Sequence, residues 1–311
     1  MKPVSRRSFL KGALLTGVAA GLRGGSLSGE EAPLRERPRV VDVQGPLESA
    51  LDVLLRELGG LGRFVKEGST VLIKPNMSFP NPPEQATTTD PALIRSLIAR
   101  CLEAGAQRVL VADHPLRSAG LCAELTGIRD ACAGIREAHL IVASQESMFQ
   151  RVTLSGTRQL REVRILRAAL QSDVQINLPR MKSHGATTVS LGTKGNMGLI
   201  WDRGIFHGSL DLNEAIADLN TRIRADLTIL DGSRVLTAGG PLGPGPVEQL
   251  GCLIGGTDPV AVDAYGISKT RWYDRAFEPH EVSHLVACHG RGLGEIDLGR
   301  VEVISQRVPA S

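Results

Sequence analysis

Short apolar runs alternate with helical patterns along most of the chain, and this alternation limits the fold more than any other feature. The segments 70–73, 108–112 and 174–178 are apolar almost throughout, and an amphipathic segment at 92–104 separates the first two. Strands that are apolar on both faces occur where helices cover both sides of a parallel sheet. The sequence therefore predicts a single α/β domain over residues 39–311, with a mainly parallel sheet and helices on both faces. The same patterns predict further strands at 227–230, 252–254 and 301–304, and further helices at 212–223, from 259 onward and at 278–288.

Two of the predicted helices begin with the same three residues. The tripeptide Thr-Asp-Pro occurs at 89–91 and again at 257–259. An aspartate at the N-cap accepts hydrogen bonds from the first backbone N–H groups, and proline fits the first helical position. We therefore expect Asp90 and Asp258 to cap helices, which explains both residues without any chemistry.

Residues 1–29 have the layout of a twin-arginine signal peptide. Arg6 and Arg7 precede Phe-Leu-Lys, and a short apolar stretch follows at 13–22. This stretch is shorter than the roughly 20 apolar residues that span a bilayer, and no later segment is long and apolar enough. The signal predicts export in the folded state by the twin-arginine translocase, a periplasmic or extracellular location and no stable membrane span. A linker rich in Glu, Pro and Arg follows at 30–38.

The excess of basic residues comes from the signal. The whole chain has 36 Lys and Arg against 33 Asp and Glu, a net charge of +3. Residues 1–29 contain five basic residues and no acidic ones, so the remainder has 31 against 33 and a net charge of −2. The charge therefore gives no indication of a nucleic-acid partner.

The five cysteines show no Cys-x-x-Cys spacing. This argues against an iron–sulfur cluster. Two alternatives follow for an oxidising compartment: Cys122 and Cys132 form a disulfide, or the cysteines are buried free thiols.

Polar side chains are densest between Pro179 and His207, directly after the predicted strand at 174–178. Ligands of open α/β sheets bind beyond the carboxyl ends of the strands. Glycines interleave this segment and let backbone N–H groups approach a ligand, while Lys, Arg and His supply charge, so the segment suits a phosphate or carboxylate. The candidate catalytic residues are Lys182, His184, Lys194, Asn196 and His207, with Asp231 from the end of another predicted strand.

Four further residues are candidates for ligand binding. Lys74 and Asn76 follow the predicted strand at 70–73, and Arg203 lies within the polar segment. Asp263 lies just beyond the first turn of the helix that Asp258 caps, where it faces either the site or solvent.

A divalent metal is an open alternative at the same strand ends. The candidate ligands are His184, His207 and Asp231, although no local ligand spacing supports them. A carboxylate such as Asp231 serves equally as a base or as a turn cap. The Gly- and Pro-rich loop at 238–246 is either a stiff surface connection or a wall over the site.

The order of these motifs resembles the family known as domain of unknown function 362. The matching segments are VLIKPN at 71–76, TTDP at 88–91, LPRMKSH at 178–184, TKGNMG at 193–198, ADLN at 217–220, LDG at 230–232 and DPVAVD at 258–263. The family's usual Lys-Asn pair is interrupted here by Gly195, which changes the register between Lys194 and Asn196. The resemblance implies no established activity, and the cluster-binding modules of some members have no matching cysteines in this chain.

These features favour an exported enzyme that acts on a small phosphate- or carboxylate-bearing ligand, with or without a metal. The alternatives are a periplasmic anion or cofactor carrier without catalysis and a maturation partner for another exported protein. The enzyme and the carrier both require the polar cluster to line a pocket. For a maturation partner, we expect the same cluster on an open surface.

Overall fold

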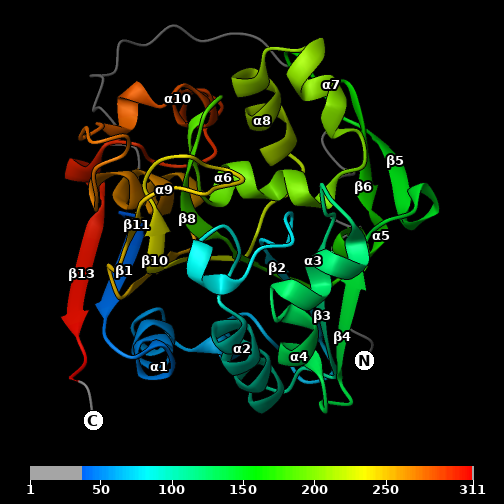
Figure 1. The fold of residues 1–311 in the computed structure, drawn as a ribbon, viewed down its shortest axis with the longest axis vertical. Coiled ribbons are helices and arrows are strands. Elements are labelled where there is room, and N and C mark those ends of the chain that lie inside the picture. Colours follow the sequence, from blue (N-terminus) through cyan, green and yellow to red (C-terminus); the bar gives the residue numbers. More distant parts are fainter. Residues whose placement is uncertain (1–36, 310–311) are drawn as a thin grey trace, which may run out of the picture. The chain divides into compact units, whose positions relative to one another are not determined.

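The computed structural model describes residues 37–309, which form one α/β domain around a mixed, mostly parallel sheet (Figure 1). Residues 1–29 and most of the linker lie outside the described residues. The sheet runs in the order β13 (Glu302–Arg307), β1 (Arg39–Gln44), β12 (Cys252–Gly256), β10 (Leu227–Leu236), β7 (Val174–Leu178), β2 (Thr70–Pro75), β3 (Arg108–Asp113) and β4 (Ala138–Val142). The predicted fold class is confirmed.

Strand β12 is the exception to the parallel arrangement. It pairs antiparallel with both β1 and β10, whereas the other pairings along the path are parallel. The chain reaches β12 from β10 through a loop and the short β11 (Val247–Glu248) rather than through a helix, and such a direct connection suits antiparallel neighbours.

Helices cover both faces of the sheet (Figure 1). The helices α1 (Leu47–Glu57), α2 (Pro91–Glu103), α3 (Ala119–Leu125) and α4 (Ile128–Cys132) contribute to one hydrophobic core, and α8 (Leu212–Asn220), α9 (Pro259–Ser268) and α10 (Ser283–Gly290) contribute to cores on the other face. Along β2, Val71 and Ile73 join the first core and Leu72 joins the other side, as the alternation of strand side chains requires.

Both predicted caps are present. The Asp90 carboxylate accepts a hydrogen bond of 3.0 Å from the Ala92 N–H, and that of Asp258 accepts bonds of 2.9 Å from Val260 and Ala261. These bonds fix the starts of α2 and α9, which lie on opposite faces of the sheet.

The polar segment after Leu178 forms several short elements. It forms β8 (Arg180–His184), which pairs with β10 and then turns back into β9 (Thr188–Ser190). The chain continues through α6 (Gly192–Gly195), the 3-10 turn η5 (Asn196–Leu199) and α7 (Arg203–Gly208). These short elements form a layer over the carboxyl ends of β2 and β7.

The Gly- and Pro-rich loop at 238–246 folds against β8. The Gly240 N–H donates to Ser183 Oγ at 3.0 Å, and the Gly185 N–H donates to the Gly240 carbonyl at 3.2 Å. Of the two predicted alternatives, the loop is a wall over the site.

All five cysteines are buried free thiols, which decides against the Cys122–Cys132 disulfide in this structure.

No helix within residues 37–309 has the length and apolar character needed to cross a membrane. A small antiparallel sheet of β5 (Phe149–Thr153) and β6 (Glu162–Leu166) packs beside α7 and α8.

Candidate functional site

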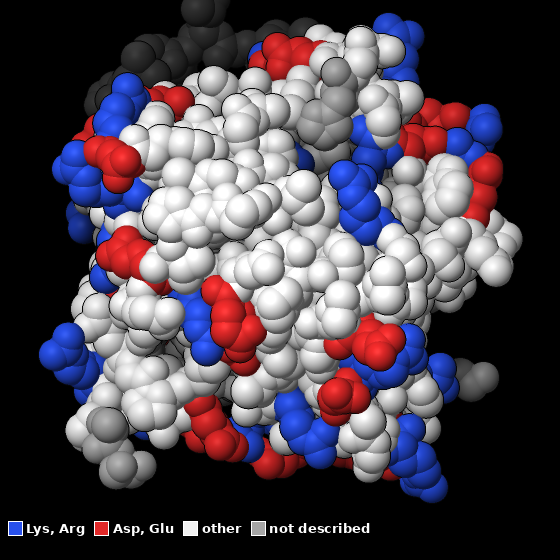
Figure 2. Space-filling view, viewed as in Figure 1, with Lys and Arg blue, Asp and Glu red and all other residues white. Residues whose placement is uncertain are grey.

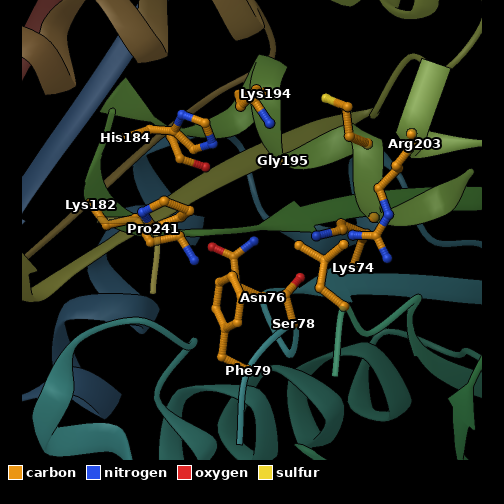
Figure 3. Close-up of a pocket in the computed structure, with 15 residues that line it drawn as sticks. Lys74, Asn76, Ser78, Phe79, Lys182, His184, Lys194, Gly195, Arg203 and Pro241 are labelled. Carbon is orange, nitrogen blue, oxygen red and sulfur yellow. The ribbon is translucent and has the colours of Figure 1, made fainter. Parts of the chain in front are cut away.

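A cavity of about 180 Å³ lies between the strand ends and the layer formed by β8, α6 and α7 (Figure 3). Strand β2 contributes Lys74, and the segment after it contributes Asn76 and Phe79. The opposite walls come from β8, β9, α6, η5, α7 and the loop at 238–246. The cavity is smaller than the roughly 300–1,000 Å³ of pockets for drug-sized ligands, so its size suits a small molecule.

Four cationic side chains line this cavity: Lys74, Lys182, Lys194 and Arg203. Each is at most 8% exposed. Of the residues that the structure describes, no Asp or Glu is part of the lining. The cavity is therefore strongly electropositive.

Only one of these cations forms an ion pair with a carboxylate among residues 37–309. Lys74 Nζ lies 3.4 Å from Asp113 Oδ1 and donates to the Pro75 carbonyl at 2.6 Å. Lys182 Nζ donates to the Thr87 carbonyl at 2.5 Å, and the Arg203 guanidinium donates to the His114 carbonyl. Carbonyl oxygens satisfy hydrogen bonds but do not neutralise charge.

Cations on the molecular surface differ from those of the cavity in their ion pairs. Figure 2 shows many Lys and Arg side chains beside Asp and Glu around the edges of the drawn face, with a broad uncharged area in its middle. Arg39 pairs with Glu302 at 3.0 Å, and Arg100 pairs with Asp52 at 2.6 Å. Arg39 and Arg100 thus form ion pairs of a kind that Lys182, Lys194 and Arg203 lack within residues 37–309.

Burial and mutual repulsion lower the pKa values of the cavity lysines. Burial lowers the pKa of Lys182 to about 7, with a further contribution from Lys74. Burial likewise lowers the pKa of Lys194 to about 7, and the charges of Arg203 and Lys74 add to the effect. Burial also lowers the pKa of Lys74, although Asp113 opposes the change. Near neutral pH, Lys182 and Lys194 can therefore give or take a proton.

His184 completes the titratable set and is 8% exposed. Its Nδ1 accepts a hydrogen bond of 3.2 Å from the Ala186 N–H. A neutral ring that accepts at Nδ1 carries its proton on Nε2. Figure 3 places this ring on the same wall of the cavity as Lys194.

Three of the predicted site residues lie outside the lining. Asp231 Oδ1 accepts from Arg180 Nη1 at 2.9 Å, and its Oδ2 accepts from the Asp90 N–H at 2.8 Å. Asn196 Nδ2 donates to Asn220 Oδ1 at 2.8 Å. Asp263 faces neither the cavity nor solvent, because its carboxylate accepts three bonds of 2.7–2.8 Å from Gly192 and Thr193. All three hold the walls in place.

The extra glycine after Lys194 has a structural consequence. Lys194 lines the cavity, whereas Asn196 points into the packing against α8, so the two side chains do not meet a ligand together. His207 belongs to α7, and its side chain lies outside the described part of the chain.

The cavity also contains residues that the strand-end argument does not find. Phe79 and Ser78 come from the extended segment after β2, Ser190 comes from β9, and Leu116 follows β3. Only the Gly- and Pro-rich composition around Pro241 signals a wall in advance. Among residues 37–309, no group of three or more His, Cys, Asp and Glu side chains is arranged to hold a metal ion.

Fold and cavity together define an α/β protein with a basic cavity at the carboxyl ends of its sheet strands. The family model described as "Domain of unknown function (DUF362)" matches residues 71–268, and the chain belongs to this family. The resemblance seen in the sequence motifs is thereby confirmed.

Two other comparisons give similarities. A thylakoid-associated protein of Synechocystis sp. is 29% identical over 226 residues, which cover 70% of this chain and 68% of that protein. The lactate racemase apoprotein of Thermoanaerobacterium thermosaccharolyticum is 12% identical with a TM-score of 0.47, and the match covers 76% of this chain. The chain matches 58% of the length of that second protein.

Proposed function

We propose that the protein is an enzyme that binds a small phosphate- or carboxylate-bearing ligand in this cavity. One observation carries the proposal: Lys182, Lys194 and Arg203 line one cavity, are each at most 8% exposed and form no ion pair with a carboxylate among residues 37–309. A buried charge without a counterion costs several kcal/mol, so such charges are retained where a ligand supplies the counterion.

The same side chains supply the means for chemistry. A group whose pKa lies near the working pH transfers protons efficiently, and Lys182 and Lys194 have pKa values of about 7. His184 adds a third proton-transfer group on the same cavity. An anion held by Arg203 and Lys74 would lie within reach of all three.

Calorimetric titration with inorganic phosphate and with oxalate tests the binding. We expect Lys182→Gln and Arg203→Gln each to weaken binding about ten- to a hundredfold, the equivalent of one hydrogen bond to a charged group of about 1.5–3 kcal/mol. The control is Lys66→Gln, which removes the same charge from an exposed position. Equal affinities in all variants, or no binding of either anion, would contradict the proposal.

The pH dependence of binding gives an independent test. An anion favours the charged lysines, so affinity for oxalate is expected to fall as pH rises from 6 to 9 through the pKa values of about 7. Oxalate is the appropriate probe because its carboxylates stay ionised throughout this range. In the double variant Lys182→Arg/Lys194→Arg, the fall is expected to disappear.

Catalysis is separated from simple binding by following the ligand itself. Pyruvate, malonate and phenyl phosphate are incubated with the protein in deuterium oxide and observed by proton NMR. Hydrolysis or deuterium exchange that Lys66→Gln retains and His184→Gln loses supports an enzyme. Binding without chemical change favours the carrier.

We also propose that the protein is exported through the twin-arginine pathway. The Arg6-Arg7 pair followed by Phe-Leu-Lys supports this proposal. Replacing both arginines by lysine should leave the protein in the cytoplasmic fraction of its own cells. The matched change Arg23→Lys, outside the pair, should leave export intact.

A further inference from the structure

The three lysines of the cavity differ in what holds their amino groups. Lys74 is paired with Asp113, and Lys182 donates to the Thr87 carbonyl. Lys194 has neither a hydrogen bond nor an ion pair within the part of the chain that the structure describes, although it is only 8% exposed. Its amino group is therefore available to a ligand.

The position of Lys194 is fixed by its backbone. It lies on α6, where Asp263 binds the N–H groups of Gly192 and Thr193 at 2.7 and 2.8 Å. The Asn220 side chain binds the Thr193 carbonyl at 2.9 Å. Figure 3 shows the amino group directed into the cavity from this short helix.

The surroundings of Lys194 make its amine nucleophilic. Burial and the nearby charges of Arg203 and Lys74 favour the neutral form and hold the pKa at about 7. A desolvated lysine beside other cationic groups is a recognised means of activating an amine for attack on a carbonyl group. Arg203 and Lys182 can meanwhile hold an anionic group of the same molecule.

We propose that Lys194 forms a Schiff base with the carbonyl carbon of a small 2-oxo acid whose carboxylate is bound by the neighbouring cations. This inference rests on the proposed function, because it names the substrate class of the same site. It also assigns different roles to the lysines: Lys194 bonds covalently, whereas Lys74 and Lys182 bind charge.

The reaction needs no oxidant or reductant. The lone pair of Lys194 Nζ forms a C–N bond while the carbonyl π electrons move to oxygen, giving a carbinolamine. In forming the carbinolamine, one proton moves from nitrogen to oxygen. The nitrogen then loses its remaining proton, the hydroxyl leaves with a proton as water, and a C=N bond remains. His184 lines the same cavity and can pass protons between nitrogen and oxygen.

Borohydride trapping tests the covalent step. The full-length protein is incubated at pH 7 with pyruvate or glyoxylate, reduced with borohydride, and measured by intact-mass and peptide mass spectrometry. We expect one reduced adduct per chain, located on Lys194. Lys194→Arg and Lys194→Met should lose at least about nine-tenths of the adduct, the tenfold change that 1.4 kcal/mol represents, and the exposed control Lys66→Arg should keep it.

Calorimetry on the same samples separates this inference from the proposed function. Lys194→Arg retains a charge and removes the nucleophile, so we expect it to bind pyruvate without forming the adduct. Pyruvate or phosphate binding with no adduct in the unmodified protein overturns the Schiff base and leaves the anion site standing. Adducts that persist in both Lys194 variants, with their fold verified by circular dichroism, also overturn it. Failure to bind any of these anions overturns both.

Discussion

Lys182 and Lys194 are cationic when the chain is unfolded at pH 7 to 10, but the folded protein holds their pKa values at about 7. The unfolded state therefore binds more protons than the folded state across this range. Burying these lysines is costly below pH 7, and the cost decreases as pH rises toward the unfolded pKa of about 10.4.

This difference predicts that the lysines make the protein more stable as pH rises above 7. Each contributes up to about 1.4 kcal/mol per pH unit to the free energy of unfolding. Urea unfolding at pH 7 and pH 9 measures the change, which should be larger in the unmodified protein than in Lys194→Met. Lys66→Met is the control. An equal change in the unmodified protein and Lys194→Met would show that Lys194 is protonated in the folded state across this range.

Residue type, strand ends and the dense polar segment together identified ten candidate residues, of which six line the cavity: Lys74, Asn76, Lys182, His184, Lys194 and Arg203. Which partner a side chain contacts in the fold was not predictable from residue type and position. Asp231 directly follows the predicted strand at 227–230, as Lys74 follows the one at 70–73, but in the structure both lie within their strands, and Asp231 meets Arg180 through the register of β8 against β10. That register depends on the tertiary fold and cannot be read from the local sequence.

At the level of elements, the layer of α6 and η5 approaches the strand ends very closely at Gly198. A Cβ atom added there would lie 1.9 Å from Asp113 Oδ1 and 2.6 Å from Lys74 Cε. Only a glycine permits this contact, which brings η5 onto the Lys74–Asp113 pair. The cavity depends on it because both Lys74 and Gly198 are part of the lining.

We predict that Gly198→Ala destabilises the protein by about 1–3 kcal/mol, the usual range for overpacking a closed interior. It should also weaken oxalate binding, because Lys74 must move. Chemical unfolding and calorimetry measure the two effects. Gly185→Ala is the matched control, since no atom lies within 4 Å of its added Cβ. Similar stability of the two variants would mean that η5 can shift freely.

The elements themselves were predictable to different degrees. The caps at Asp90 and Asp258 and the apolar strands follow from local rules that the structure obeys. Strand β8 escaped prediction because all of its buried side chains except Met181 are polar and give no apolar pattern. The antiparallel direction of β12 could not be predicted either, because an apolar run has the same pattern in a parallel and in an antiparallel strand.

At the scale of the whole molecule, Arg180 and Asp231 tie three distant segments together behind the cavity. Arg180 is fully buried, and it donates to the Thr88 carbonyl at 2.7 Å and to Asp231 at 2.9 Å. Asp231 in turn accepts the Asp90 N–H at the start of α2. The pair thus joins β8, β10 and the segment before α2.

Because Asp231 holds Arg180, a substitution can test whether Asp231 stabilises the fold or takes part in catalysis. Asp231→Asn removes the nearer counterion of the buried Arg180 and leaves only Asp90, 3.9 Å away, so it is expected to lower the free energy of unfolding by about 3–5 kcal/mol. The double variant Arg180→Met/Asp231→Leu removes both charges and should recover a large part of that loss. Anion binding by the folded fraction should change less than twofold in Asp231→Asn, because Asp231 lies outside the lining. If Asp231→Asn instead kept full stability and lost the reaction seen by NMR, Asp231 would belong to the chemistry, and the cavity would have to extend to it.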